Sequence, residues 1–128
     1  MKNILLTIAL VFGFISSSAM AAEKADFNLE TTQDLLDLCM VQPGQPFSVE
    51  AIHFCEGFIS GAVRYHNAVV GKDMKPIICY PEETTRNDAI QLLNEWGLAN
   101  KGNTELMGDL AVYGLIRALQ SKWSCDPD

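Results

Sequence analysis

The feature that most constrains the fold is the stretch at residues 48–70, which contains no proline and is long enough for about six helical turns. Ser48 is a suitable N-cap, and apolar residues recur along one side at the 100° spacing of an α-helix. That arc comprises Ile52, Cys55, Ile59, Ala62, Val63, His66, Val69 and Val70, bordered by Phe54, Phe58 and Tyr65. The stretch therefore predicts one long amphipathic helix, the spine of the domain.

Two glycines, Gly57 and Gly61, lie one turn apart at the edge of this arc. A glycine inside a helix costs about 1 kcal/mol relative to alanine, so the pair needs a packing reason. We expect a close approach of another helix at these positions, either within the fold or between two copies of the chain. The second alternative predicts a homodimer.

Capping signals place the remaining helices. Thr31 with Asp34 and Thr85 with Asp88 resemble capping boxes, which predict helices at about 32–40 and 85–99. A last helix is expected from Thr104 to about residue 119, and residues 22–29 are expected to be a poorly ordered polar lead-in. Short turns make neighbouring helices antiparallel. The sequence thus predicts an all-α fold, a small four-helix domain of two helical hairpins.

The four cysteines follow the first 38 residues in an even number, without C-x-x-C pairs, which favours two disulfides in an oxidising compartment. Cys39 ends the first helix and Cys55 lies two turns into the second, near the same end of one hairpin. Cys79 precedes the third helix and Cys125 follows the fourth. Of the three possible pairings we therefore expect Cys39–Cys55 and Cys79–Cys125.

The first 21 residues have the pattern of a cleavable signal peptide. Lys2 supplies the positive start, an apolar run occupies residues 4–15, and Ala19-Met20-Ala21 has the A-x-A form of a cleavage site. The apolar run is shorter than the roughly 20 residues of a membrane span. We expect export, cleavage after Ala21, a single domain at residues 22–128 and no membrane anchor after cleavage.

The charge balance argues against a nucleic-acid or anionic-membrane partner. The chain carries sixteen acidic and nine basic residues, a net charge of −7, and removal of Lys2 leaves −8. Both of those partners require a positive surface. The balance suits a basic protein partner, although solubility alone would also explain it.

No catalytic, metal or cofactor site is predicted. Ser60 lacks the G-x-S-x-G context of a hydrolase nucleophile, and the cysteines are assigned to disulfides. His53 and His66 fall about 140° apart on the long helix, too far round to share a metal. Because His66 lies in the apolar arc, we interpret it as a hydrogen-bonded core histidine. The chain is predicted not to be an enzyme.

Three groups of residues together resemble the Rap/Tai family of periplasmic immunity proteins. They are Leu38-Cys39, the block Phe54-Cys55-Glu56-Gly57-Phe58-Ile59-Ser60-Gly61, and Ile78-Cys79-Tyr80-Pro81-Glu82, followed by the late Cys125. The resemblance covers about residues 31–125. It implies a compact, disulfide-linked helical fold that is often dimeric. It also implies neutralisation, in the periplasm, of a peptidoglycan amidase delivered by type VI secretion.

A second hypothesis is an acid-stress chaperone, because the family fold is similar to that of HdeA-type periplasmic chaperones. Such a chaperone would open at low pH as its carboxylates become protonated. Another protein-binding role in the cell envelope is the third hypothesis. A neighbouring gene for a secreted amidase would favour immunity over both.

An inhibitor without chemistry of its own must occlude the enzyme's cleft with a protruding segment on a rigid base. We expect this segment to be the turn at residues 97–104, and the loop at residues 71–75 is the rival. In the turn Gly102 is expected to allow a sharp bend, and replacement of its polar neighbours by alanine is expected to leave the fold intact. The predicted partner-binding residues are Asn100, Lys101, Gly102 and Asn103.

Overall fold

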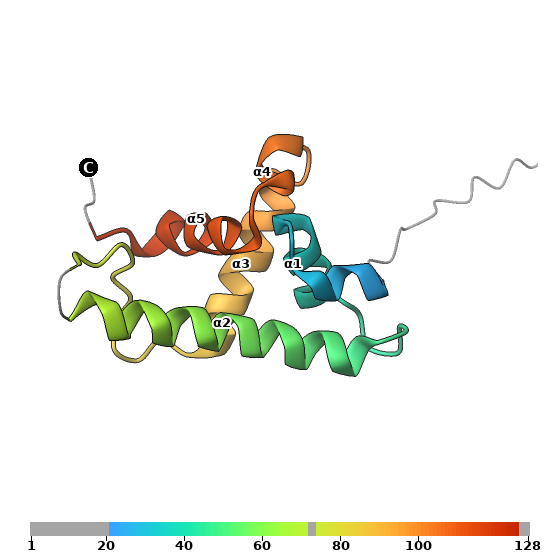
Figure 1. The fold of residues 1–128 in the computed structure, drawn as a ribbon, viewed down its shortest axis with the longest axis horizontal. Coiled ribbons are helices and arrows are strands. Elements are labelled where there is room, and N and C mark those ends of the chain that lie inside the picture. The colour runs from blue at the N-terminus through green and yellow to red at the C-terminus, as the bar shows by residue number, and fades with distance from the viewer. Residues whose placement is uncertain (1–20, 72–73, 126–128) are drawn as a thin grey trace, which may run out of the picture.

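The computed structural model describes residues 21–71 and 74–125, and within these ranges the chain is helical and has no β-strand. A short 3-10 helix, η1, precedes five α-helices, of which the long α2 lies along one side of the others (Figure 1). The bounds are η1 Lys24–Asn28, α1 Thr32–Cys39, α2 Ser48–Val70, α3 Arg86–Asn100, α4 Thr104–Gly108 and α5 Ala111–Trp123. The all-α prediction is confirmed. Of the predicted signal peptide, residues 1–21, the first 20 residues lie outside the described part of the chain.

Both predicted disulfides are present. Cys39 pairs with Cys55 and fastens the end of α1 to α2, with 5.2 Å between the two Cα atoms. Cys79 pairs with Cys125 and fastens the segment before α3 to the residues after α5, with 4.8 Å between Cα atoms. The element order was therefore a sufficient guide to the pairing.

Both predicted capping boxes form. The Thr31 hydroxyl accepts a hydrogen bond from the Asp34 amide, and the Asp34 carboxylate accepts one from the Thr31 amide. Thr85 and Asp88 make the same exchange at the start of α3. The hydrogen bonds from Thr85 lower the pKa of Asp88, because they favour its charged form.

Two expectations near the N-terminus are wrong. Residues 22–29, expected to be poorly ordered, contain the helix η1, because Ala22 and Asp26 are buried against the fold and η1 packs on α1. The N-cap of α2 is Phe47, not Ser48, and Phe47 has a left-handed backbone with φ of 60°. The Phe27 ring contacts both Phe47 and Phe54 edge-to-face, so aromatic packing at this corner accompanies the unusual backbone.

Helices α1, α3 and α5 form the centre of the fold, and α2 packs against α1 and α3. Only part of the predicted arc of α2 is buried, because Ile52 is 37% and Tyr65 73% exposed. The largest buried side chains come from four helices: Leu35, Leu36, Leu38, Ile59, Leu93, Leu115 and Leu119. In the second half of the fold α3 pairs with α5, and the short α4 forms the corner between them.

The expectation of one continuous fourth helix is wrong, because Asp109 and Leu110 have extended backbones with ψ of 163° and 140°. The buried Thr32 contacts the backbone at this break. Its amide donates to the Asp109 carbonyl over 2.7 Å, and its hydroxyl donates to the carbonyls of Asp109 and Leu110 over 3.1 and 3.2 Å. Arg117 Nη1 lies 2.6 Å from Asp109 Oδ2, and its hydrogen bond holds the pKa of Asp109 below the usual range.

The closest helix contacts within the chain do not occur at the glycines predicted for this purpose. A Cβ added at Gly57 or Gly61 would have no neighbour within 4 Å, so the alternative of a close approach within the fold is wrong. A Cβ at Gly114 on α5 would lie 2.8 Å from Cβ of Thr32 on α1. The sequence could have indicated this contact, because Gly114 lies at the centre of the apolar side of its helix. Gly57 and Gly61, in contrast, lie at the edge of an apolar arc.

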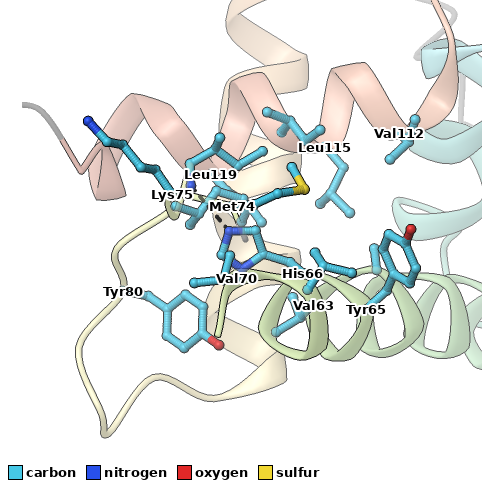
Figure 2. Close-up of a pocket in the computed structure, with 15 residues that line it drawn as sticks. Val63, Tyr65, His66, Val70, Met74, Lys75, Tyr80, Val112, Leu115 and Leu119 are labelled. Carbon is cyan, nitrogen blue, oxygen red and sulfur yellow. Dashed lines mark hydrogen bonds between the residues drawn. The ribbon is translucent and has the colours of Figure 1, made fainter. Parts of the chain in front are cut away.

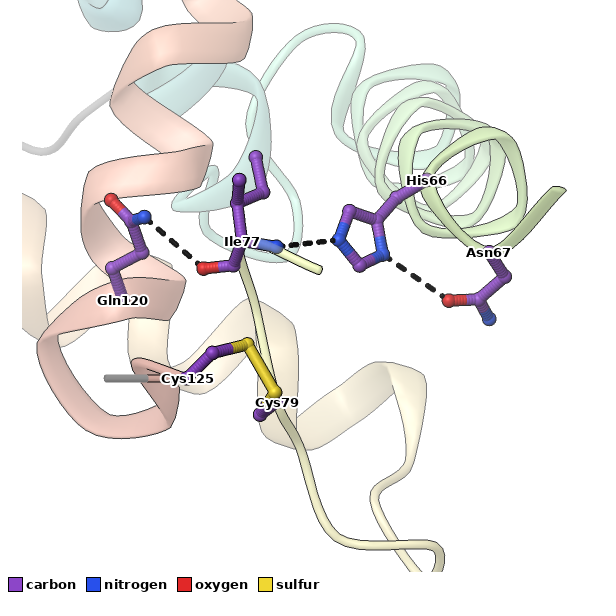
Figure 3. The surroundings of a disulfide bond; sticks show 6 residues. All are labelled: His66, Asn67, Ile77, Cys79, Gln120 and Cys125. Carbon is purple, nitrogen blue, oxygen red and sulfur yellow. Dashed lines mark hydrogen bonds between the residues drawn. A yellow bond between two sulfur atoms is a disulfide. The ribbon is translucent and has the colours of Figure 1, made fainter. Parts of the chain in front are cut away.

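The segment between α2 and α3 is held by both neighbouring helices. The Ile77 amide donates to His66 Nε2 over 3.3 Å, and Gln120 Nε2 of α5 donates to the Ile77 carbonyl over 3.1 Å (Figure 3). The Cys79 amide donates to the Trp123 carbonyl over 2.8 Å. His66 is thus hydrogen-bonded as predicted, but it is half-buried at the surface of α2 rather than in the core.

Candidate partner-binding site

The turn between α3 and α4 lies at the edge of the fold farthest from α2 (Figure 1). Its predicted residues follow each other from the end of α3 to the cap of α4. Lys101, Gly102 and Asn103 are exposed, and Asn100 is half-buried. The turn therefore presents a short exposed segment that is continuous with two helices.

Hydrogen bonds hold this turn in one conformation. Asn100 Nδ2 donates to the Trp96 carbonyl over 2.8 Å, and the Asn103 amide donates to the Asn100 carbonyl over 2.8 Å. Asn103 Oδ1 accepts from the Leu106 amide over 3.2 Å and so caps α4. Replacement of Asn103 by alanine is therefore expected to cost about 1 kcal/mol, because it removes an N-cap. The exposed Lys101 side chain forms no hydrogen bond or ion pair within the described part of the chain, so it is the side chain available to a partner.

The turn does not depend on a glycine at position 102 for a sharp bend, in contrast to the prediction. Among the described glycines only Gly44 has a positive φ, so the backbone at Gly102 is one that other residues also adopt. A Cβ at Gly102 would meet no atom within 4 Å. The position is open to larger side chains, which makes it suitable for a test of partner contact.

Hollows flank the turn on two sides. One, of about 550 Å³, lies between α1 and the end of α3 and includes Asp37, Met40 and Lys101 in its walls. The other, of about 470 Å³, borders Asn100, Gly102 and Thr104. The turn is thus bordered by two shallow surface hollows.

The base of the turn is anchored to α1 by close packing that the sequence analysis missed. A Cβ at Gly97 would lie 2.7 Å from Cδ1 of Leu36, so any larger residue here would require the Leu36 side chain to move. Asn94 Nδ2 also donates to the Cys39 carbonyl over 3.4 Å. The spacing of Leu93 and Gly97 on one helical face was the signal that could have revealed this contact.

The rival loop at residues 71–75 is described only in part. Gly71, Met74 and Lys75 are exposed. Met74 and Lys75 border an apolar groove between α2 and α5, which is distant from the α3–α4 turn (Figures 1 and 2). The two predicted contact sites are therefore separate surfaces that mutations can distinguish.

The two histidines have separate partners. His53 Nδ1 lies 3.6 Å from Glu56 Oε2, and Glu56 also lies 3.4 Å from Arg86. His66 Nδ1 faces Asn67 Oδ1 at 3.3 Å, which together with the Ile77 contact assigns its proton to Nδ1. Within residues 21–71 and 74–125 no three His, Cys, Asp or Glu side chains are placed to bind a metal ion.

Comparison with known proteins identifies the family. The model of the family described as Rap1a immunity proteins matches residues 31–125, from the first capping box to the last cysteine. No curated protein and no solved structure matches the chain. Immunity proteins are generally non-enzymatic, bind a secreted effector protein and in this family are typically periplasmic. Since the match covers most of its length, the chain belongs to the family of Rap1a immunity proteins.

Proposed function

We propose that this chain is a periplasmic immunity protein that binds a type VI secreted peptidoglycan amidase and occludes its active-site cleft. The observation that carries the proposal is the family match over residues 31–125. The resemblance to the Rap/Tai family implies that such an amidase has a cleft with a cysteine–histidine pair. An inhibitor that covers the cleft prevents substrate from reaching this pair.

The α3–α4 turn supports occlusion as the mechanism. It lies at the edge of the fold farthest from α2 (Figure 1), and its base is fixed by the Gly97 contact with Leu36 and by the internal hydrogen bonds of Asn100 and Asn103. A rigid segment loses little conformational entropy on binding, so more of its contact energy contributes to affinity. We place Lys101 and the Gly102 backbone at the centre of the contact.

A lysis assay tests this function. Cells that express a type VI peptidoglycan amidase in the periplasm should lyse, and co-expression of the chain with its leader should protect them. Lys101→Glu and Gly102→Glu should each weaken the complex at least tenfold, about 1.4 kcal/mol, without unfolding the protein. Isothermal titration calorimetry measures the affinity, and circular dichroism monitors the fold.

Lys75→Glu in the rival loop is the matched control, since it makes the same charge change at an exposed lysine. If Lys75→Glu weakens binding and Lys101→Glu does not, the contact lies on the other surface and the turn is only a connector. Amidase that neither binds the chain nor loses activity in its presence contradicts the proposed function itself.

We also propose that the protein is a homodimer in which Gly57 and Gly61 of α2 face a second copy. Both glycines are exposed and have open space around them, which leaves room for another helix. Multi-angle light scattering on the oxidised protein should give twice the monomer mass. A single-copy mass at high micromolar concentration contradicts the dimer.

A further inference from the structure

An apolar groove of about 210 Å³ lies between the second half of α2 and α5. These two helices are not among the pairs in extensive contact, so the groove remains open along their length. Val63, Val69, Leu115 and Ile116 are among the aliphatic side chains of its walls. An engineered apolar cavity of about 150 Å³ holds a benzene molecule, so this groove has room for a slender hydrocarbon group.

The groove has a charged end and an apolar end. Figure 2 places Lys75 at one end and Tyr65 with Val112 at the other, and His66 and Met74 lie between them. No aspartate or glutamate is among the described residues that line it. A ligand with an apolar chain and a negatively charged head would match this distribution.

The neighbouring hollow has the same charge character. It has a volume of about 170 Å³, shares Val63, Tyr80 and Leu119 with the groove, and adds Arg64 and Arg86 to the lining. Its described lining also contains no carboxylate. Arg86 is paired with Glu56 over 3.4 Å, so Arg64 is the side chain that adds positive charge to this face.

The groove is held open by contacts that do not depend on a ligand. Hydrogen bonds to His66 on α2 and Gln120 on α5 fix the Ile77 backbone between the two helices (Figure 3). The disulfide between Cys79 and Cys125 fastens the same segment two residues later. Preformed apolar sites with a few polar groups are typical of small-molecule binding.

We propose that the groove binds a free medium-chain fatty acid, with the alkyl chain between α2 and α5 and the carboxylate at Lys75. The recessed shape favours a flexible chain over the broad surface of a folded partner. Charge complementarity favours a carboxylate over a neutral or cationic head. This inference is independent of the immunity function, because it concerns a surface separate from the α3–α4 turn.

Isothermal titration calorimetry with decanoate, kept below its micelle concentration, tests the site on protein expressed as the full chain and purified as processed by the cell. Decanoate should bind with one-to-one stoichiometry. Octanoate should bind roughly tenfold more weakly, because two buried methylenes are lost. Decyltrimethylammonium, which has the same chain and the opposite charge, should bind more weakly than decanoate.

Matched variants locate the site. Ala62→Phe fills the groove and should abolish binding, whereas Ala68→Phe, an exposed position on the same helix outside the groove lining, should not. Lys75→Gln should weaken decanoate two- to fivefold and strengthen decyltrimethylammonium, whereas the exposed Lys122→Gln should affect neither. Lys75→Gln is conservative and keeps the measurement informative if Ala62→Phe does not fold.

Several outcomes would overturn the proposal. Equal affinity for the anionic and cationic ligands refutes the role of Lys75, and the absence of any chain-length dependence refutes the groove. Binding to vesicles of anionic phospholipid without binding to decanoate indicates a membrane-surface site instead. If Ala62→Phe halves the mass in light scattering and decanoate does not bind, the groove is an interface between copies.

Discussion

The hydroxyl of Thr32 donates a hydrogen bond to the carbonyl oxygen of Asp109 over 3.1 Å, between residues 77 positions apart in the chain. Thr32 is fully buried, and its amide and hydroxyl both donate to the Asp109 carbonyl. The hydroxyl also lies 3.2 Å from the Leu110 carbonyl, which accepts from the Tyr113 and Gly114 amides of α5 as well. The relationship ties the start of α1 to the corner between α4 and α5. It therefore also positions α4, which follows the proposed contact turn.

Thr32→Val should destabilise the protein, because valine has the same shape but cannot donate to the two carbonyls. We expect a loss of about 1–3 kcal/mol in the free energy of unfolding, measured by urea denaturation. Thr104→Val, at an exposed position in α4, is the control and should change it by less than about 0.5 kcal/mol. Equal effects of the two variants would show that the buried hydroxyl does not stabilise the corner.

Gly114→Ala should destabilise the fold, and Gly57→Ala should stabilise it. The new methyl at position 114 would lie 2.8 Å from Cβ of Thr32, and overpacking of this kind costs about 1–3 kcal/mol. At Gly57 a methyl meets no atom, so the gain in helix propensity, about 1 kcal/mol, remains. Thermal unfolding at low protein concentration separates these effects from association.

A substitution at Gly61 tests the proposed dimer. Gly61→Leu should halve the mass seen in light scattering, because its side chain would occupy the space proposed for the second copy, while the helical circular dichroism spectrum stays unchanged. A dimer that persists in this variant would assign the interface to another surface.

Removal of the two disulfides should have unequal effects. In the chain-entropy account, the loop of 16 residues closed by Cys39 and Cys55 contributes about 3 kcal/mol, and the loop of 46 residues closed by Cys79 and Cys125 about 4 kcal/mol. Two double variants, each with both cysteines of one disulfide replaced by serine, measure the two contributions by urea denaturation. A larger loss from the shorter loop would mean that residual structure in the unfolded chain outweighs loop entropy.

Asp37→Asn should raise stability at neutral pH. Burial raises the pKa of Asp37, and the nearby carboxylates of Asp26, Asp34 and Glu23 raise it further, while the hydrogen bond from Gln33 opposes them. Because the folded pKa lies above the unfolded value of 3.8, the ionised carboxylate opposes folding above that folded pKa. The opposition disappears as the pH falls below 3.8. Asparagine keeps the acceptor for Gln33 and removes the charge.

The expected gain at pH 7 is below about 1 kcal/mol, since solvent screens a half-exposed charge. The melting temperatures of the variant and the parent should converge near pH 3. Glu95→Gln is the matched control, because Gln91 donates to exposed Glu95 across the same four-residue spacing over 2.8 Å. If the variant still melts at a higher temperature than the parent at pH 3, the gain in stability comes from packing and not from removal of the charge.

The sequence by itself determined the features that depend on neighbouring residues or on element order. The boxes at Thr31 and Thr85 set the starts of α1 and α3, since a cap forms between residues only three positions apart. The long helix followed from periodicity, and the pairing of Cys39 with Cys55 followed from which helix ends short turns bring together.

The tertiary structure alone decided the features that depend on contacts between distant residues. At the break between α4 and α5, the Asp109 and Leu110 carbonyls accept from the buried Thr32, and no local pattern at residues 109 and 110 reports this distant donor. Which glycines admit a close neighbour depended on what lies opposite them: Leu36 faces Gly97 and Thr32 faces Gly114, whereas nothing in the described chain faces Gly57. The groove between α2 and α5 likewise exists because Ile77 bridges two helices, so its cationic end could not be read from the order of residues.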